Sequence, residues 1–227
     1  MSTNPQEVKL SVVTPCYNEE QNLEELTKRL IEAIKPIFGQ DFEIILVDDG
    51  STDHSWKTIE RLSTETSHQV RGIKLSRNFG HGNALTAGLQ QSCGQYVFIL
   101  DADLQDPPEL LGSFYTKLRE GHDVVYGKRL SRKEETAFKI LSAKFFYKLI
   151  NRLSDTDIPR DTGDFRLVTR RVIDLYLKMP ENFRFVRGMI AWMGFKQAPL
   201  DYHRDPRYAG ETKYTFTKML FFALFFH

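Results

Sequence analysis

The stretch Phe98-Ile-Leu-Asp101-Ala-Asp103-Leu-Gln105-Asp-Pro-Pro-Glu109 joins an apolar run to a cluster of acidic side chains. The apolar run predicts a buried strand, and the two prolines predict that it stops and that a turn or helix follows. Because alternate strand residues point the same way, Asp101, Asp103 and Gln105 can converge on one point. Three such oxygen ligands suit Mg²⁺ or Mn²⁺, together with substrate phosphates, better than zinc. The alternative is an acidic strand end that only caps the next helix.

Outward from this stretch, β-rich runs alternate with segments of helical period. The predicted strands are 10–14, 42–47, 70–75, 96–100 and 124–126, and the predicted helices are 19–34, 56–62, 84–91 and 110–118. This alternation predicts an α/β fold in which a Rossmann-like, mostly parallel sheet is covered by helices on both faces.

Four polar motifs each follow directly after a predicted strand. They are Pro15-Cys16-Tyr17-Asn18-Glu19, Asp48-Asp49-Gly50, Ser76-Arg77-Asn78 and Asp101-Ala102-Asp103. In open parallel sheets, ligands bind outside the carboxyl ends of the strands, so all four motifs would line one crevice. Turn composition alone explains one such loop. Four loops at equivalent ends, two of them doubly acidic, indicate a binding site.

The crevice has acids and few lysines, and the chain contains neither a G-x-x-x-x-G-K-[ST] nor a G-x-G-x-x-G motif. Phosphates bound there would therefore need a metal ion to neutralise them. Asp49 could accept a hydrogen bond from a base imide, and Tyr17 could pack on the face of the base. These features indicate a nucleotide sugar as the ligand.

The chain resembles family 2 glycosyltransferases of the GT-A fold, and among them the polyprenyl-phosphate glycosyltransferases. The resemblance covers nearly the whole chain and rests on Pro15-x-Tyr17-Asn18-Glu19, Val47 to Asp53, Ser76 to Gly80, Asp101 to Glu109 and Gly163 to Arg166. It implies a metal site at Asp101, Asp103 and Gln105. The predicted donor-binding residues are Pro15, Tyr17, Glu19, Asp48, Asp49, Arg77, Asp101, Ala102, Asp103 and Arg207, the last from a loop that closes on the diphosphate.

The acceptor side has a different character. Lys128, Arg129, Arg132 and Lys133 form a basic cluster, and a helix with a broad apolar stripe and regularly spaced cations is predicted over 137–153. Such a helix suits an anionic membrane surface, although an ordinary helix packed on the sheet has the same pattern. We favour the membrane, and we expect Arg129, Arg132 and Arg166 to bind the acceptor phosphate.

Asp164 lies in a predicted turn, Gly163-Asp164-Phe165-Arg166. The resemblance implies that it is the catalytic base of the bacterial glucosyltransferases, although mannose synthases of the group often lack a carboxylate there. We therefore expect Asp164 and Asp103 to be catalytic residues, and we favour for Asp164 a role in orienting the acceptor or a neighbouring cation such as Arg166. A cap of a helix at 168–175 is the alternative.

Composition narrows the class and location of the protein. Among 227 residues the net charge is +1, which argues against a nucleic-acid-binding protein. Two cysteines without a C-x-x-C partner and an amino terminus without a signal peptide predict a cytoplasmic protein. No run of eighteen apolar residues exists, but 219–226 is almost wholly apolar. We expect a chain that continues into transmembrane helices or packs this segment on a membrane or partner, with self-association as one possibility.

These observations predict four regions: a nucleotide-sugar-binding GT-A core (1–130), a basic amphipathic membrane-surface helix (131–155), an acceptor side with a lid loop (156–211) and an amphipathic juxtamembrane segment (212–227). The predicted reaction is inverting transfer of a hexose from a nucleotide sugar to a polyprenyl phosphate at the cytoplasmic membrane face, with Mg²⁺ or Mn²⁺ as cofactor. UDP-glucose is the favoured donor, and GDP-mannose, UDP-N-acetylglucosamine or a 4-amino-arabinose derivative are alternatives. A catalytically silent nucleotide-sugar-binding scaffold and a soluble glycosyltransferase acting on protein or polysaccharide are rival functions.

Overall fold

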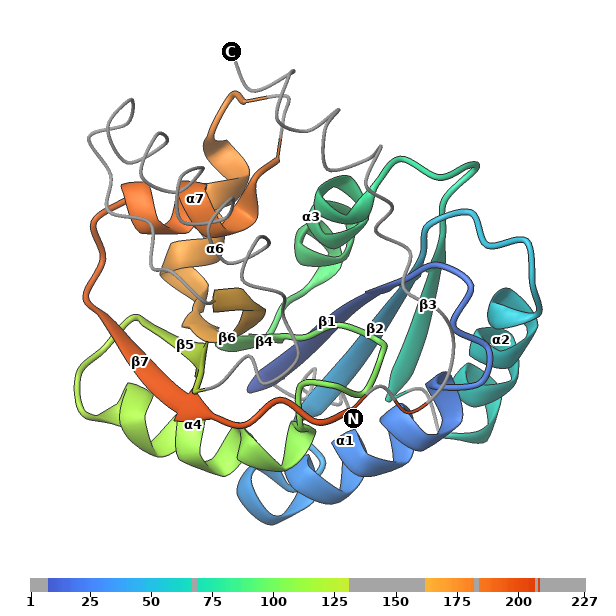
Figure 1. Ribbon diagram of the computed structural model, residues 1–227, viewed down its shortest axis with the longest axis horizontal. Coiled ribbons are helices and arrows are strands. Elements are labelled where there is room, and N and C mark those ends of the chain that lie inside the picture. The colour runs from blue at the N-terminus through green and yellow to red at the C-terminus, as the bar shows by residue number, and fades with distance from the viewer. Residues whose placement is uncertain (1–7, 67–68, 131–161, 182–183, 207, 209–227) are drawn as a thin grey trace, which may run out of the picture.

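The computed structural model describes residues 8–66, 69–130, 162–181, 184–206 and 208, which build one seven-stranded sheet (Figure 1). Its strand order is β3-β2-β1-β4-β6-β5-β7. The strands are β1 (Leu10–Cys16), β2 (Phe42–Asp48), β3 (Val70–Lys74), β4 (Tyr96–Ile99), β5 (Val124–Arg129), β6 (Thr162–Thr169) and β7 (Gln197–Tyr202).

Strand β6 is the antiparallel member of this sheet. It pairs antiparallel with β4 on one side and with β5 on the other, whereas β1, β2, β3 and β4 pair parallel to one another and β7 pairs parallel to β5. The carboxyl ends of β1 to β5 therefore lie along one edge. The predicted α/β class with a mostly parallel sheet is confirmed.

Helices cover both faces of the sheet, as Figure 1 shows. On one face α1 (Leu23–Phe38), α2 (Ser55–Glu65) and α4 (Leu111–Arg119) pack in a core with Val12, Leu46 and Phe98. On the other face α3 (His81–Gln91), α6 (Arg170–Lys178) and α7 (Val186–Trp192) pack in a second core with Val13 and Val47. Neighbouring strand residues thus enter opposite cores because side chains alternate across a sheet.

Two local predictions need correction. The 163–166 segment was predicted as a turn but lies inside β6, where Phe165 and Leu167 face one core and Val168 faces the other. Asp164 therefore does not cap the next helix, which begins at Arg170 after the cap residue Thr169. Charged and apolar residues alternate from Asp164 to Leu167, which is the period of a strand.

Strand β1 also runs further than predicted, through Pro15 to Cys16. Strand β4 pairs with β1 only as far as Val13, so the β4 side of β1 is open at Pro15. The missing N–H of proline therefore costs no ladder hydrogen bond there.

Several predicted features lie outside the described residues: the 131–155 helix, the 212–227 segment, Arg132 and Arg207. The four region boundaries stay predictions, although the sheet itself draws strands from both sides of residue 130. Among the described residues, no helix is both long and apolar enough to cross a membrane.

Candidate active site

The loops that follow β1 and β2 are bound to each other at the carboxyl edge of the sheet. Asn18, which has a φ of 54°, accepts hydrogen bonds from the backbone nitrogens of Thr52 (2.8 Å) and Asp53 (3.4 Å). The hydroxyl of Ser51 in turn accepts from the backbone nitrogen of Asn18 at 2.9 Å. These contacts fix the positions of Tyr17 and Glu19, which flank Asn18 and are partly buried.

The two acids at the end of β2 have different roles. Asp49 accepts hydrogen bonds from the backbone nitrogens of Phe79 (2.7 Å) and Gly80 (3.0 Å), so its carboxylate holds the loop after β3. Asp48 accepts from the backbone nitrogen of Ser51 at 3.1 Å, while its second oxygen is buried without a hydrogen-bond partner. A buried unpaired acceptor is costly, so this oxygen of Asp48 lacks a donor that a bound ligand could supply, and the predicted contact of Asp49 with a base stays a prediction.

Gly50 brings the loops after β2 and β3 into direct contact. It has a φ of +70°, and an added Cβ would lie 2.4 Å from the backbone carbon of Arg77. Arg77 is exposed and stacks its guanidinium on the ring of Phe79, 4.0 Å from the centroid. The loops after β2 and β3, which carry the predicted donor-binding residues Asp49 and Arg77, therefore meet.

The acidic motif leaves the sheet in a turn. Strand β4 ends at Ile99, and the loop from Asp101 contains a left-handed residue, Leu104 (φ 59°). The predicted strand alternation therefore does not account for the placement of these acids. The carboxamide nitrogen of Gln105 donates to the carbonyl of Asp205 at 3.2 Å, and Ala102 is buried. The metal-binding role of Gln105 stays a prediction.

Within the described residues, no group of three or more His, Cys, Asp or Glu side chains is arranged to hold a metal ion. The donor set nevertheless fits a hard cation, because one oxygen of Asp101 is buried without a hydrogen-bond partner. Burial raises the pKa of Asp101 to about 6; His81 opposes this shift, and Asp106, Asp164 and Asp103 add to it. Asp101 and Asp103 could supply two carboxylate ligands, with the remaining positions left to phosphates and water.

His81, the first residue of α3, links the acidic motif to β6. Its Nε2 lies 3.0 Å from an oxygen of Asp164 and 3.7 Å from Asp101. Desolvation alone would lower the pKa of His81, but Asp101 and Asp164 raise it to about 9, so the imidazole is a cation at neutral pH. A single side chain thus lies beside the predicted metal ligand Asp101 and the predicted catalytic base Asp164.

Asp164 is surrounded by cations. Arg166 and Arg187 lie 3.6 and 3.8 Å from one of its oxygens, in addition to His81 at the other. Burial would raise the pKa of Asp164, but these partners outweigh burial and hold it well below its ordinary value. A carboxylate with so low a pKa is a weak proton acceptor, which favours an orienting role over that of a base.

The predicted acceptor arginines are placed differently from one another. Arg166 is buried and donates to the carbonyl of Gly163 at 2.9 Å. Arg129 is partly exposed, and its guanidinium lies so close to Gly163 that an added Cβ there would be 2.7 Å away. Arg187 donates to the carbonyl of Thr162 at 2.7 Å. Arg129 and Arg187 are thus more accessible than Arg166; Arg187 lies beside Asp164, and Arg129 lies beside Gly163 and Tyr202.

Sequence reasoning missed Arg187 as a member of the site. It placed His81 in or near the site but gave it no metal-binding or catalytic role, because no histidine spacing indicated a metal. Arg187 lies on a helix that was not predicted, although Val186, Met189 and Ile190 have helical spacing and are buried.

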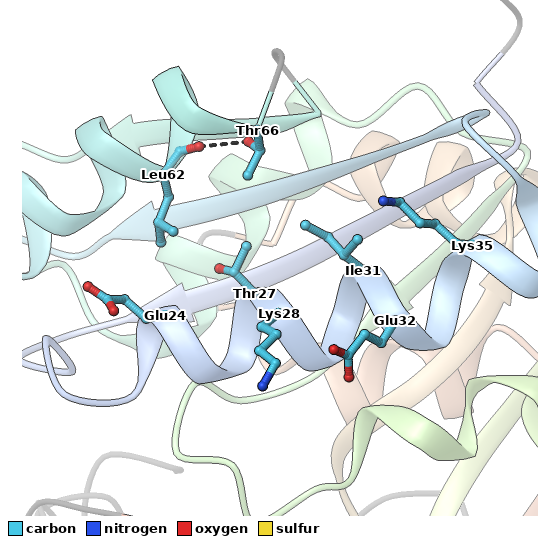
Figure 2. A pocket seen from close by; sticks show the side chains of 8 residues that line it. All are labelled: Glu24, Thr27, Lys28, Ile31, Glu32, Lys35, Leu62 and Thr66. Atoms are coloured by element: carbon cyan, nitrogen blue, oxygen red, sulfur yellow. Dashed lines mark hydrogen bonds between the residues drawn. The ribbon is translucent and has the colours of Figure 1, made fainter.

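A shallow groove also lies between α1 and α2, away from these loops (Figure 2). None of the predicted site residues lines it. Charged residues of α1 surround a small apolar floor, and the hydroxyl of Thr66 donates to the carbonyl of Leu62 at 2.6 Å. The lining consists of Glu24, Thr27, Lys28, Ile31, Glu32, Lys35, Leu62 and Thr66.

The sheet and its carboxyl-edge loops define a GT-A glycosyltransferase architecture. Residues 11–177 match the model of glycosyl transferase family 2, and the chain belongs to this family. It is 45% identical over 96% of its length to the glycosyltransferase sll0501 of Synechocystis sp., of which it covers 68%. It is 35% identical over 96% of its length to the bactoprenol glucosyl transferase of Shigella phage SfX, of which it covers 70%. Some other relatives are covered only to 64% or 65%, so the chain spans about two thirds of these proteins.

Among solved structures, the chain is similar to the mannosyltransferase PcManGT from Pyrobaculum calidifontis in complex with GDP-Man and Mn²⁺. The TM-score is 0.62 at 20% identity, over 85% of this chain and 55% of that one. This likeness supports the GT-A fold.

Proposed function

We propose that the chain transfers a glucosyl group from UDP-glucose to a polyprenyl phosphate, with inversion at the anomeric carbon. The observation that carries the proposal is the link from Asp101 through His81 to Asp164, which joins the donor loop to the arginine-rich acceptor side. Relatives named bactoprenol glucosyl transferases, at 35% identity, support this acceptor and sugar.

On the donor side, Asp48 would receive the base and Tyr17 would pack on it, while Asp101 and Asp103 would hold Mg²⁺ or Mn²⁺. The bound ion would stabilise the leaving diphosphate by Lewis acidity. The unpaired buried oxygens of Asp48 and Asp101 support these assignments, because both lack a hydrogen-bond partner.

On the acceptor side, a lipid phosphate would lie against Arg129 and Arg187. A phosphomonoester has a second pKa of about 6, so it is largely dianionic at pH 7 and needs no base to become a nucleophile. One of its oxygens would attack the anomeric carbon while the bond to the diphosphate breaks on the opposite side. Asp164 would hold His81 and the arginines in position.

The location follows from the acceptor. A polyprenyl phosphate has its phosphate at the membrane surface, so we propose that the protein works on the cytoplasmic face of the bacterial inner membrane. The predicted basic helix at 131–155 would contribute to binding that surface.

The test is a donor panel with undecaprenyl phosphate in vesicles, Mg²⁺ or Mn²⁺, and radiolabelled UDP-glucose, UDP-N-acetylglucosamine or GDP-mannose. We expect label from UDP-glucose in an organic-extractable, mild-acid-labile product. Asp103→Asn should lower turnover by at least about 10²-fold, since it weakens a preorganised charge site. Asp174→Asn, on the exposed side of α6, is the matched control and should have the wild-type rate.

Transfer from GDP-mannose instead of UDP-glucose would contradict the donor assignment. Absence of labelled lipid with every donor would contradict the polyprenyl phosphate acceptor. Full activity of Asp103→Asn would contradict the metal site.

A further inference from the structure

The segment that follows β7 is attached to the acidic loop. We call residues 203–206 the strap. The backbone nitrogen of Asp205 donates to the carbonyl of Gln105 at 3.0 Å, and the Gln105 side chain donates back to Asp205 at 3.2 Å. A carboxylate oxygen of Asp205 also lies 4.0 Å from Arg29. The strap and the acidic loop are therefore held against each other.

Arg204 extends a guanidinium from the strap to two acids of this loop. Its terminal nitrogen lies 3.6 Å from Asp103, and its Nε lies 3.6 Å from Asp106. Asp103 and Asp106 are 7% and 0% exposed, so their charges are poorly hydrated. Arg204 supplies positive charge at the place where the proposed function puts a divalent ion.

The contacts of Arg204 are looser than those of a fixed ion pair. Arginine paired to a carboxylate in bidentate fashion has N···O distances of about 2.7–2.9 Å. Arg29 and Glu109 have this geometry, at 2.6 and 2.8 Å. Arg204 makes neither contact at hydrogen-bond length, and its buried Nε has no hydrogen-bond partner. It balances charge without being locked in place.

We propose that Arg204 is a built-in counter-cation of the acidic loop and competes with the divalent ion for Asp103. The inference rests on the proposed function, since it assumes a metal at Asp103. A divalent cation on Asp103 would lie close to the guanidinium, and the two cations would repel. Metal binding would therefore displace Arg204 and loosen the strap. Because this displacement costs free energy, Arg204 weakens the binding of the metal ion in the absence of nucleotide. Arg204 acts through Asp103 and is a positioning residue.

The test is a titration of the protein with Mn²⁺ in the absence of nucleotide. The electron paramagnetic resonance signal of the free ion measures how much Mn²⁺ remains unbound. We expect Arg204→Gln to bind Mn²⁺ about tenfold tighter than wild type, because the competing charge is gone. Without metal the same variant should have a lower Tm. Arg204→Lys keeps the charge and should stay near the wild-type affinity. Arg61→Gln removes an exposed arginine paired with Glu65 and should change nothing.

A second measurement does not depend on a variant that folds. In wild-type protein, Mn²⁺ should accelerate hydrogen exchange at the Asp205 amide, whose bond to Gln105 would loosen. Equal or weaker Mn²⁺ binding by Arg204→Gln, or unchanged exchange at Asp205, would overturn this inference and leave the proposed function standing. Wild-type protein that binds no Mn²⁺, even with UDP present, would overturn the proposed metal site and this inference with it.

Discussion

A single carboxylate, Asp164, shows how its neighbours decide its chemistry. Burial alone would favour the protonated form, but His81, Arg187 and Arg166 hold its pKa well below the ordinary value. Asp164 therefore stays ionised through the physiological range. Its charge is available to hold cations, and the sugar transfer proposed above requires nothing more of Asp164.

Replacing His81 tests this coupling. His81→Asn should lower kcat about 10- to 100-fold, because Asp164 and Asp101 lose the cation between them and the arginines shift. The KM for the donor should change less than kcat, because Asp48, which would receive the base, is held by Ser51 rather than by His81. Steady-state kinetics with both substrates gives the two constants.

The control for this experiment is His54→Asn, an exposed histidine just before α2, which should retain wild-type kinetics. A His81→Asn enzyme with unchanged kcat would show that the link has no role in turnover.

Glu43 gives a pH prediction far from the site. Burial would raise the pKa of Glu43, but hydrogen bonds from Ser11 and Cys93 and the charge of Arg71 outweigh it and lower the pKa. A lowered folded-state pKa contributes stability that is present above the unfolded value of about 4.3 and is lost as pH falls through the folded value. Glu43→Gln should therefore be less stable at pH 7 by about 1–3 kcal/mol.

Urea unfolding at pH 7 and at pH 3 measures this difference. The gap between wild type and Glu43→Gln should shrink at the lower pH, because wild-type Glu43 becomes protonated. Glu60→Gln, on the exposed face of α2, should match wild type at both pH values. A gap that grows on acidification would refute the assignment.

At the scale of elements, strand β6 explains why the acceptor side was only partly predictable. The parallel strands β1 and β2 are buried on both faces and appear as mainly apolar runs, which sequence reasoning recognises. Strand β6 carries Asp164 and Arg166 between apolar residues, so its charges were read as loop chemistry. Strand β7, Gln197–Tyr202, has a proline and an aspartate and no clear apolar period, and it was not predicted.

The site was predictable where it depends on strand ends, and it was not predictable where it depends on topology. Asp48, Asp49, Asp101 and Asp103 follow predicted strands and indeed lie at the carboxyl edge. Arg187 and Arg204 reach the site because α7 packs beside β6 and the strap packs beside the acidic loop. No local pattern encodes that packing.

The contact between the loops after β2 and β3 gives an element-scale prediction. Gly50→Ala should lose about 2–4 kcal/mol of stability. The added methyl group would clash with the Arg77 backbone, and alanine is also unfavourable at the positive φ of this position. Gly39 also has a positive φ of +62° but open space around it, so Gly39→Ala should lose only about 1 kcal/mol.

Denaturant unfolding gives both values, and calorimetry with UDP and Mn²⁺ should show weaker nucleotide binding for Gly50→Ala alone. Equal losses in the two variants would mean that the close approach to Arg77 contributes nothing.

At the scale of the whole molecule, the proposed acceptor requires contact with a membrane. The sequence predicts a basic amphipathic helix at 137–153, with Lys144, Lys148 and Arg152 beside its apolar stripe. We expect the chain to sediment with vesicles rich in phosphatidylglycerol, and each cation to contribute about 1 kcal/mol. Replacing these three residues by glutamine should release most of the protein, and added salt should do the same.

The matched control replaces Lys28, Lys35 and Lys57 of α1 and α2 by glutamine, which removes the same charge elsewhere on the surface. Equal loss of vesicle binding in both triple variants would indicate a general effect of net charge, and the predicted surface helix would then have no special part.

The place of β6 between β4 and β5 also matters while the protein is being made. Strand β5 leaves the ribosome more than thirty residues before the strand that will connect it to the sheet. Until β6 arrives, one edge of β4 stays open to any passing polypeptide that can extend the ladder. The nascent chain therefore depends on late synthesis to close its centre, and a pause in translation between the two strands would lengthen the time in which it can aggregate.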